Sequence, residues 1–148
     1  MQKERRSARE LALNILYQID AAGLPMEEAL QVALNQSSLE GEARVFAESL
    51  VRGTLGKVGE IDERLRGLSP DWPLKRQAAV DRNILRLAAF EIDNVDSVPD
   101  VVSINEAVEM AKKFSTAESG KFINGVLAAY LRLPKTKTEV EKVDSADS

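Results

Sequence analysis

Lysine and arginine residues gather at the start of the chain, where they could bind the phosphates of a nucleic acid. Lys3, Arg5, Arg6 and Arg9 stand against Glu4 alone within the first nine residues. The whole chain carries a formal net charge of -4, so a polyanion would be attracted to this edge and repelled elsewhere. A solvated helix start accounts for the same charges equally well, and the cluster by itself leaves both interpretations open.

A second candidate is the segment 121–127, with the sequence Lys-Phe-Ile-Asn-Gly-Val-Leu. Lys121 and Phe122 combine a cation for phosphate with a ring on which an unpaired base could stack. Asn124 could cap a helix, bind a loop or read a base edge. Gly125 inside a helix costs about 1 kcal/mol relative to alanine, so we expect a close backbone approach there. Taken alone, a core phenylalanine at a tight helix crossing is the simpler interpretation.

The side chains that most enzymes use are missing. The chain contains no cysteine and no histidine, which excludes disulfides, thiolate metal sites, cysteine nucleophiles and imidazole bases. It has no glycine-rich phosphate loop and no H-E-x-x-H or G-x-S-x-G motif. Only a carboxylate-only or serine–lysine enzyme remains formally possible. We therefore predict a protein that is not an enzyme and that needs no cofactor or metal.

The elements that must position these residues are predicted to be helices. The 148 residues are 44% hydrophobic and 30% charged, with few glycines and prolines, which is typical of one soluble domain built from long helices. Apolar residues recur at spacings of three and four in about seven segments. These predicted helices cover 7–20, 25 to about 34, about 40–55, 58–68, 76–93, 103 onward, and about 117–132. The fold class is therefore all-α, and the helix over 76–93, apolar on more than one face, should be central.

Two local signals mark the loops and helix starts. The segment 69–73 contains two prolines, which forbid a helix interior there, and we expect Trp72 to pin this loop to the core. Ser103 and Glu106 have the spacing of a capping box, in which each side chain binds the backbone amide of the other. This pattern predicts that a helix begins at Ser103, after a loop over 94–102.

The two ends of the chain differ in character from its middle. Residues 134–148 lack an apolar period, so we expect a disordered polar tail after a single domain over 1–133. The basic start leads into an amphipathic segment instead of an apolar stretch. We therefore expect no signal peptide, no membrane contact and a cytoplasmic location.

Five blocks follow one another in a characteristic order. They are residues 5–13 with 16–18, 50–53 with 60–62, 81–91, 98–99 with 104–112, and 121–127. These blocks resemble the NusB family of transcription antitermination factors, and the last two are the most specific. The resemblance implies an all-helical fold of two three-helix bundles packed at a steep angle, which agrees with a division of the chain near residue 70.

The resemblance also implies partners. It points to single-stranded boxA RNA, to ribosomal protein S10 (NusE), and to the RNA polymerase antitermination complex that acts in rRNA transcription. By position, the implied RNA-binding residues are Lys3, Arg5, Arg6, Arg9, Tyr17, Gln18, Arg86, Lys121, Phe122 and Asn124. The implied partner-binding residues are Asp81, Glu106 and Glu109. Some family members form homodimers, which the sequence does not decide, and the interrupted arginine cluster predicts modest affinity for RNA alone.

Two other functions stay open on the sequence. The same fold occurs in the RNA-binding domain of rRNA cytosine methyltransferases, which continue into a large catalytic domain. A purely structural helical adaptor would explain the basic start as ordinary surface. The RNA surface predicted here requires that the cations of the first helix and the turn around Phe122 lie close together in the fold.

Overall fold

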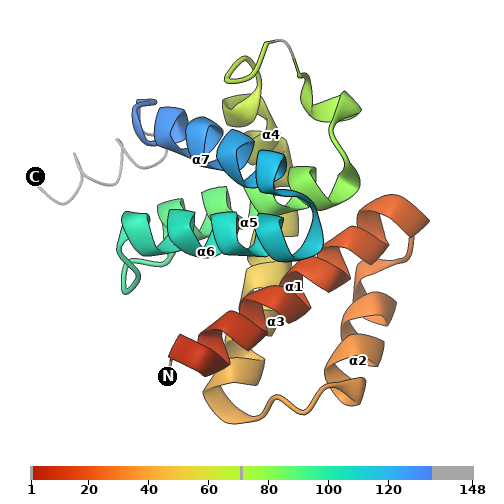
Figure 1. The fold of residues 1–148 in the computed structure, drawn as a ribbon. Coiled ribbons are helices and arrows are strands. Elements are labelled where there is room, and N and C mark those ends of the chain that lie inside the picture. The colour runs from red at the N-terminus through yellow and green to blue at the C-terminus, as the bar shows by residue number, and fades with distance from the viewer. Residues whose placement is uncertain (1, 71, 135–148) are drawn as a thin grey trace, which may run out of the picture.

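The chain folds into helices, as its periodicity predicts. The computed structural model describes residues 2–70 and 72–134, and within these it contains seven α-helices and one short 3-10 helix over Leu74–Arg76 (Figure 1). The α-helices are α1 (Gln2–Ala22), α2 (Met26–Gln36), α3 (Gly41–Gly56), α4 (Val58–Leu65), α5 (Ala79–Asn94), α6 (Asp100–Phe114) and α7 (Ala117–Leu131). No helix among the described residues is long and apolar enough to cross a membrane.

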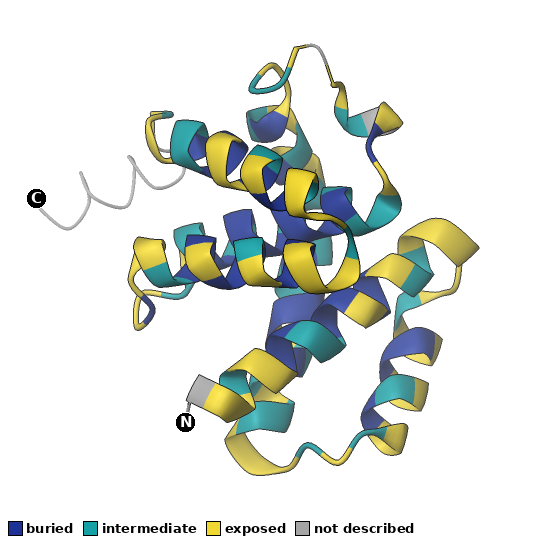
Figure 2. Cartoon of the chain, viewed as in Figure 1, coloured by how far each residue is buried: buried dark blue, intermediate teal, exposed yellow. Residues whose placement is uncertain are grey.

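The helices form two groups of three that share one core. Helices α1, α2 and α3 pack together, and helices α5, α6 and α7 form the second group, while α4 lies against α5 and α7. In Figure 1, α2 and α3 run nearly perpendicular to α6 and α7. Helices α1 and α3 both pack on α5, so buried side chains run continuously from one group into the other (Figure 2).

The central position predicted for the fifth helix is confirmed. Helix α5 packs on α1, α3, α4, α6 and α7, and it buries side chains on more than one face, among them Ile84, Leu87 and Ala89. Its start differs from the prediction of residue 76. Gln77 and Ala78 have extended backbone and separate the 3-10 turn from α5, so the apolar period alone placed the start too early.

The first helix begins earlier than predicted, at Gln2 instead of near residue 7. The basic residues are therefore part of the helix, and its geometry decides where each one points. Ala8, Ala12, Ile15 and Leu16 form the buried face. Cations on that side of the helix must point into the protein, whereas those on the opposite side point into solvent.

The predicted capping box is wrong. Helix α6 begins at Asp100 after Pro99, whose φ of -60° and ψ of 144° end the preceding loop. Ser103 therefore lies inside the helix, and its hydroxyl is buried without a hydrogen-bond partner among the described residues. Glu106 accepts hydrogen bonds from Arg6 of α1 instead of capping its own helix. A proline at the helix entrance, together with a distant arginine, overrides the local signal.

Two further expectations about the loops and glycines are also wrong. A side chain at Gly125 would meet no atom within 4 Å, so no backbone approaches it closely; the crowded glycine is Gly53, under the ring of Phe90. Trp72 is 55% exposed and does not close its loop over the core. Apart from Pro134, the predicted tail over 134–148 lies outside the described residues.

Candidate nucleic-acid interface

One face of α1 is open to solvent along its whole length. Lys3, Ser7, Asn14 and Tyr17 are exposed on it, and Glu10 between them is partly exposed. These positions follow one another at intervals of three and four, so they form a single stripe on the helix. The ring of Tyr17 is 41% exposed, which leaves room for a flat partner. Helix α1 therefore contributes one continuous exposed stripe to the candidate site.

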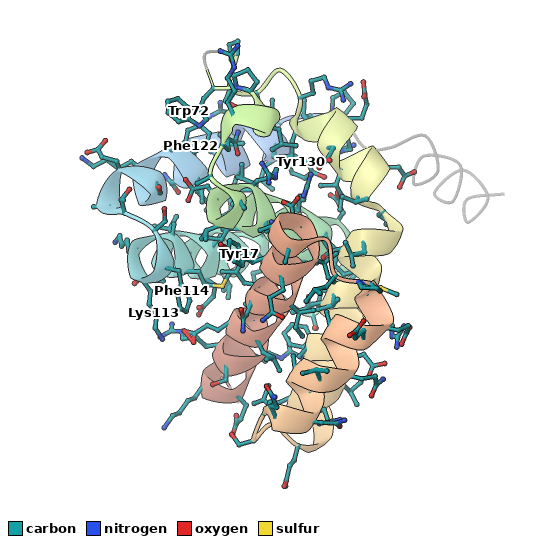
Figure 3. All side chains as sticks on the ribbon, turned by 90° about the vertical axis from the view of Figure 1, so that its right-hand side faces the viewer. Tyr17, Trp72, Lys113, Phe114, Phe122 and Tyr130 are labelled. Atoms are coloured by element: carbon teal, nitrogen blue, oxygen red, sulfur yellow. The ribbon has the colours of Figure 1, made fainter. Side chains whose placement is uncertain are left out.

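The C-terminal turn of α6 lies beside this stripe. Lys113 places its Nζ atom 2.8 Å from Oε1 of Glu10, and the same Nζ lies 5.2 Å from the centre of the Phe114 ring. Phe114 is 45% exposed. Figure 3 shows Tyr17, Phe114 and Lys113 on the same part of the molecule. The structure thus adds a cation and a ring that the sequence had not selected, although a basic last turn on an apolar helix was a visible signal.

An open groove of about 670 Å³ runs along α1 and is bordered by the segment after α2, by Val80 of α5 and by the end of α6. Its walls include Ser7, Asn14 and Tyr17 of α1 and Phe114 of α6. We call the residues Lys3, Arg6, Ser7, Asn14, Tyr17, Lys113 and Phe114 the α1–α6 surface. It combines cations, hydrogen-bonding side chains and two exposed rings, which are the groups that bind single-stranded nucleic acids.

Arg9 does not belong to this surface. Its guanidinium is buried and donates to the carboxylate of Glu91 in α5, with Nε 3.1 Å and 3.0 Å from the two oxygens. The two side chains are only 4% and 2% exposed. The sequence did contain a signal, because Arg9 precedes Leu13 and Leu16 by four and seven residues on the apolar side of α1. The expectation that Arg9 offers its charge to RNA is therefore not supported by its position.

The two preceding arginines are placed differently. Arg5 lies over the ring of Phe46 in α3, 4.8 Å from its centre. Arg6 is 58% exposed, and its Nε and Nη2 atoms donate to the two carboxylate oxygens of Glu106 at 3.0 Å and 2.9 Å. These hydrogen bonds, together with the negative charge of Glu106, raise the pKa of Arg6 above its ordinary value. Only Arg6 of this pair lies next to the exposed stripe.

The segment 121–127 does not join the N-terminal cations. Phe122 is half-buried and packs on the core, and Figure 3 shows it near Trp72, whereas the first turn of α1 lies at the opposite end of the molecule. Lys121 and Asn124 are exposed. The expected single surface of N-terminal cations and the Phe122 turn is therefore wrong, because α7 lies on the far side of α6 from the start of α1.

Several other predicted residues are engaged within the protein. Arg86 donates to Asp62 at 2.8 Å and 2.9 Å and lies 3.3 Å from Asp20, which leaves it 15% exposed. Gln18 donates to the Asn14 side chain at 3.3 Å.

The residues predicted for the protein partner differ in exposure. Asp81 is buried and accepts a hydrogen bond from Ser119 at 3.0 Å, while its other oxygen has no partner among the described residues. Glu106 is also buried and is engaged by Arg6. Glu109 is exposed, with Lys112 at 3.5 Å. Of these three acids, Glu109 is the one that a partner can reach directly.

Comparisons with known sequences agree on one family. The NusB family model matches residues 6–132. A transcription antitermination protein NusB from Symbiobacterium thermophilum is 42% identical over 151 residues, which cover 97% of this chain and 99% of that protein. Another, from Bacillus licheniformis, is 46% identical over 125 residues, which cover 84% of this chain and 94% of that protein.

Solved structures give the same result for the fold. T. maritima NusB superposes with a TM-score of 0.82 at 32% identity and covers 93% of this chain and 96% of its own. A crystal structure of the antitermination factors NusB and NusE in complex with dsRNA matches with a TM-score of 0.78 at 28% identity, over 88% of this chain and 97% of the other. With the family model spanning all but the ends of the sequence and the helices superposing throughout, the chain belongs to the NusB family.

Proposed function

We propose that this protein is a transcription antitermination factor that binds single-stranded boxA RNA together with ribosomal protein S10 (NusE) in complexes of RNA polymerase. The observation that carries the proposal is the α1–α6 surface, where Tyr17 and Phe114 are exposed beside Lys113. The names of the curated relatives support the antitermination role. A related structure that holds NusB, NusE and RNA supports the two partners.

The chemistry of this surface suits an unpaired strand. Lysine and arginine neutralise phosphates and release counterions, which makes binding depend on salt. Exposed rings offer stacking that is worth roughly 1–3 kcal/mol per base and requires bases free of a helix. The surface has three cations. Two of them, Arg6 and Lys113, each have a carboxylate within 4.0 Å, whereas Lys3 has none among the described residues. We therefore expect modest affinity for RNA alone and tighter binding once S10 completes the surface.

Replacement of Tyr17 tests the RNA surface. We expect Tyr17→Ala to weaken binding of a labelled single-stranded boxA RNA by roughly tenfold, the equivalent of one lost stacking contact. The measurement is fluorescence anisotropy at two salt concentrations, with a duplex of the same sequence as competitor. Trp72→Ala is the matched control, because Trp72 is also exposed but lies away from α1 (Figure 3). Equal effects of the two replacements would contradict the proposed surface.

A charge reversal at Glu109 tests the protein partner. Because Glu109 is exposed on α6, we expect Glu109→Lys to leave the fold intact. It should weaken S10 binding by roughly fivefold, which is the effect expected from the reversal of one surface charge. Binding is measured by titration calorimetry in the absence of RNA, and Glu60→Lys on α4 serves as the control for net charge. Unchanged S10 affinity would remove Glu109 from the interface. Light scattering of the free protein checks the homodimer that some relatives form.

A further inference from the structure

The ion pair between Arg6 and Glu106 joins the RNA surface to the second helix group. Arg6 lies on α1 and Glu106 on α6, one hundred residues further along the chain. Two N–H groups of the guanidinium, on Nε and Nη2, face the two carboxylate oxygens at 3.0 Å and 2.9 Å. This is the two-pronged geometry in which arginine binds a carboxylate most strongly. The edge of Arg6 that carries these two groups is therefore occupied.

A phosphate group that used the same edge would have to displace Glu106, because the guanidinium fork fits the oxygens of a phosphate as well as those of a carboxylate and one edge holds one anion at a time. The other edge of the guanidinium, formed by Nη1 and the second N–H of Nη2, has no hydrogen-bond partner among the described residues. A phosphate bound there would lie next to the negative charge of Glu106. Glu106 therefore opposes RNA at Arg6 both by occupation and by repulsion.

The burial of Glu106 makes it costly for Arg6 to leave this carboxylate. Its side chain is 11% exposed, whereas that of Arg6 is 58% exposed. Within the described residues, the Glu106 carboxylate accepts hydrogen bonds from Arg6 alone. If Arg6 turned outward to a phosphate, Glu106 would be left charged, nearly buried and without a donor, which is unfavourable.

We propose that Glu106 is an internal counterion that competes with RNA phosphate for Arg6 and thereby limits the affinity of the α1–α6 surface. This inference rests on the proposed function, since it concerns how strongly that surface binds RNA. Arg6 binds Glu106 in the free protein, and phosphate replaces Glu106 in the complex. Glu106 thus lowers RNA affinity from a nearly buried position beside the binding surface.

The replacement Glu106→Gln distinguishes two roles for Glu106: competition with phosphate for Arg6, and support of Arg6 as it binds RNA. The amide keeps the size of the side chain and loses its charge, so Arg6 becomes free for phosphate. We expect single-stranded RNA to bind about fivefold more tightly, the upper end of what one exposed ion pair contributes. The slope of log K against log salt should become steeper by about 0.7, because the charge of Arg6, no longer cancelled by Glu106, then neutralises one phosphate and releases a cation that was condensed on the RNA.

Glu63→Gln is the matched control. Glu63 of α4 also accepts a hydrogen bond from an arginine, Arg66, which follows the helix directly, and its replacement changes the net charge equally. It should raise affinity by less than about twofold, with the slope unchanged. Arg6→Gln in the Glu106→Gln background should abolish the gain. Thermal unfolding of each variant confirms that the folds are comparable.

The outcomes distinguish the two hypotheses. If the unaltered protein does not bind single-stranded RNA, or binds it with an affinity that does not depend on salt, the proposed function is wrong. If it binds but Glu106→Gln binds no more tightly than Glu63→Gln, or binds more weakly, Glu106 supports Arg6 instead of competing for it. In that case this inference is overturned while the proposed function stands.

Discussion

Glu91→Gln should destabilise the protein by about 3–5 kcal/mol, the loss expected when one partner of a buried ion pair is removed. Glu91 lies on α5 and receives three hydrogen bonds from Arg9 of α1. Both side chains are almost fully buried. Without the carboxylate, the guanidinium has lost its counterion in a poorly solvated place. Urea unfolding followed by circular dichroism measures the change in the free energy of unfolding.

The control is the replacement of both partners by apolar residues. In the double variant Arg9→Met and Glu91→Leu no buried charge is left, and most of the stability should return, as it does when buried ion pairs are exchanged for packed side chains. A double variant as unstable as Glu91→Gln would show that packing, not charge, governs the site. Removal of Arg9 would likewise leave the Glu91 carboxylate buried and unpaired, so that replacement should also destabilise the protein.

Gly53→Val is expected to destabilise the protein by about 3 kcal/mol, the upper end of the usual range for overpacking. Gly53 lies inside α3, and the Phe90 ring of α5 covers it so closely that an added Cβ would come within 2.1 Å of the ring. The ring must therefore leave its position, and it is itself packed against the core. Since α3 and α5 belong to different helix groups, the change loosens the junction between them. Thermal and urea unfolding report the loss.

Gly125→Val is the matched control for this prediction. Gly125 also lies inside a helix, α7, but an added Cβ there would meet nothing within 4 Å. Its replacement should change stability by less than about 0.5 kcal/mol, because valine is at least as good a helix former as glycine. Shortening the ring in the double variant Gly53→Val and Phe90→Leu should recover part of the loss. Equal effects at the two glycines would mean that helix propensity, not the contact with Phe90, explains the result.

The charges of α1 do more than offer a surface to a polyanion. Four of its described residues take part in ion pairs with α6 or α5, and the first three pairs are Arg6 with Glu106, Arg9 with Glu91, and Glu10 with Lys113. Near the end of the helix, Asp20 binds Arg82 and Arg86 of α5. Two of the charges that the sequence assigned to RNA, those of Arg6 and Arg9, therefore also hold the two helix groups together.

Much of the fold could be predicted from the sequence because it depends on local patterns. Apolar spacing of three and four gave the number of helices and the central place of α5. Proline gave the break near residue 70. The five ordered blocks gave the family, which the matched model over residues 6–132 confirms. These features follow from residues that are neighbours in the chain, so no knowledge of distant contacts is needed.

The composition of the site was decided by tertiary structure. Arg9 and Glu91 are 82 positions apart, and nothing local tells whether an arginine on α1 will meet a carboxylate or solvent. Glu106 has the sequence pattern of a helix cap, but in the folded protein its carboxylate accepts hydrogen bonds from Arg6, which is distant in the sequence. Phe122 packs against the core, whereas Phe114 is exposed and lines the groove beside α1. The burial and pairing of each charge depend on contacts with residues that are far away in the chain. These contacts, and the electrostatic fields that come with them, exist only once the helices have packed.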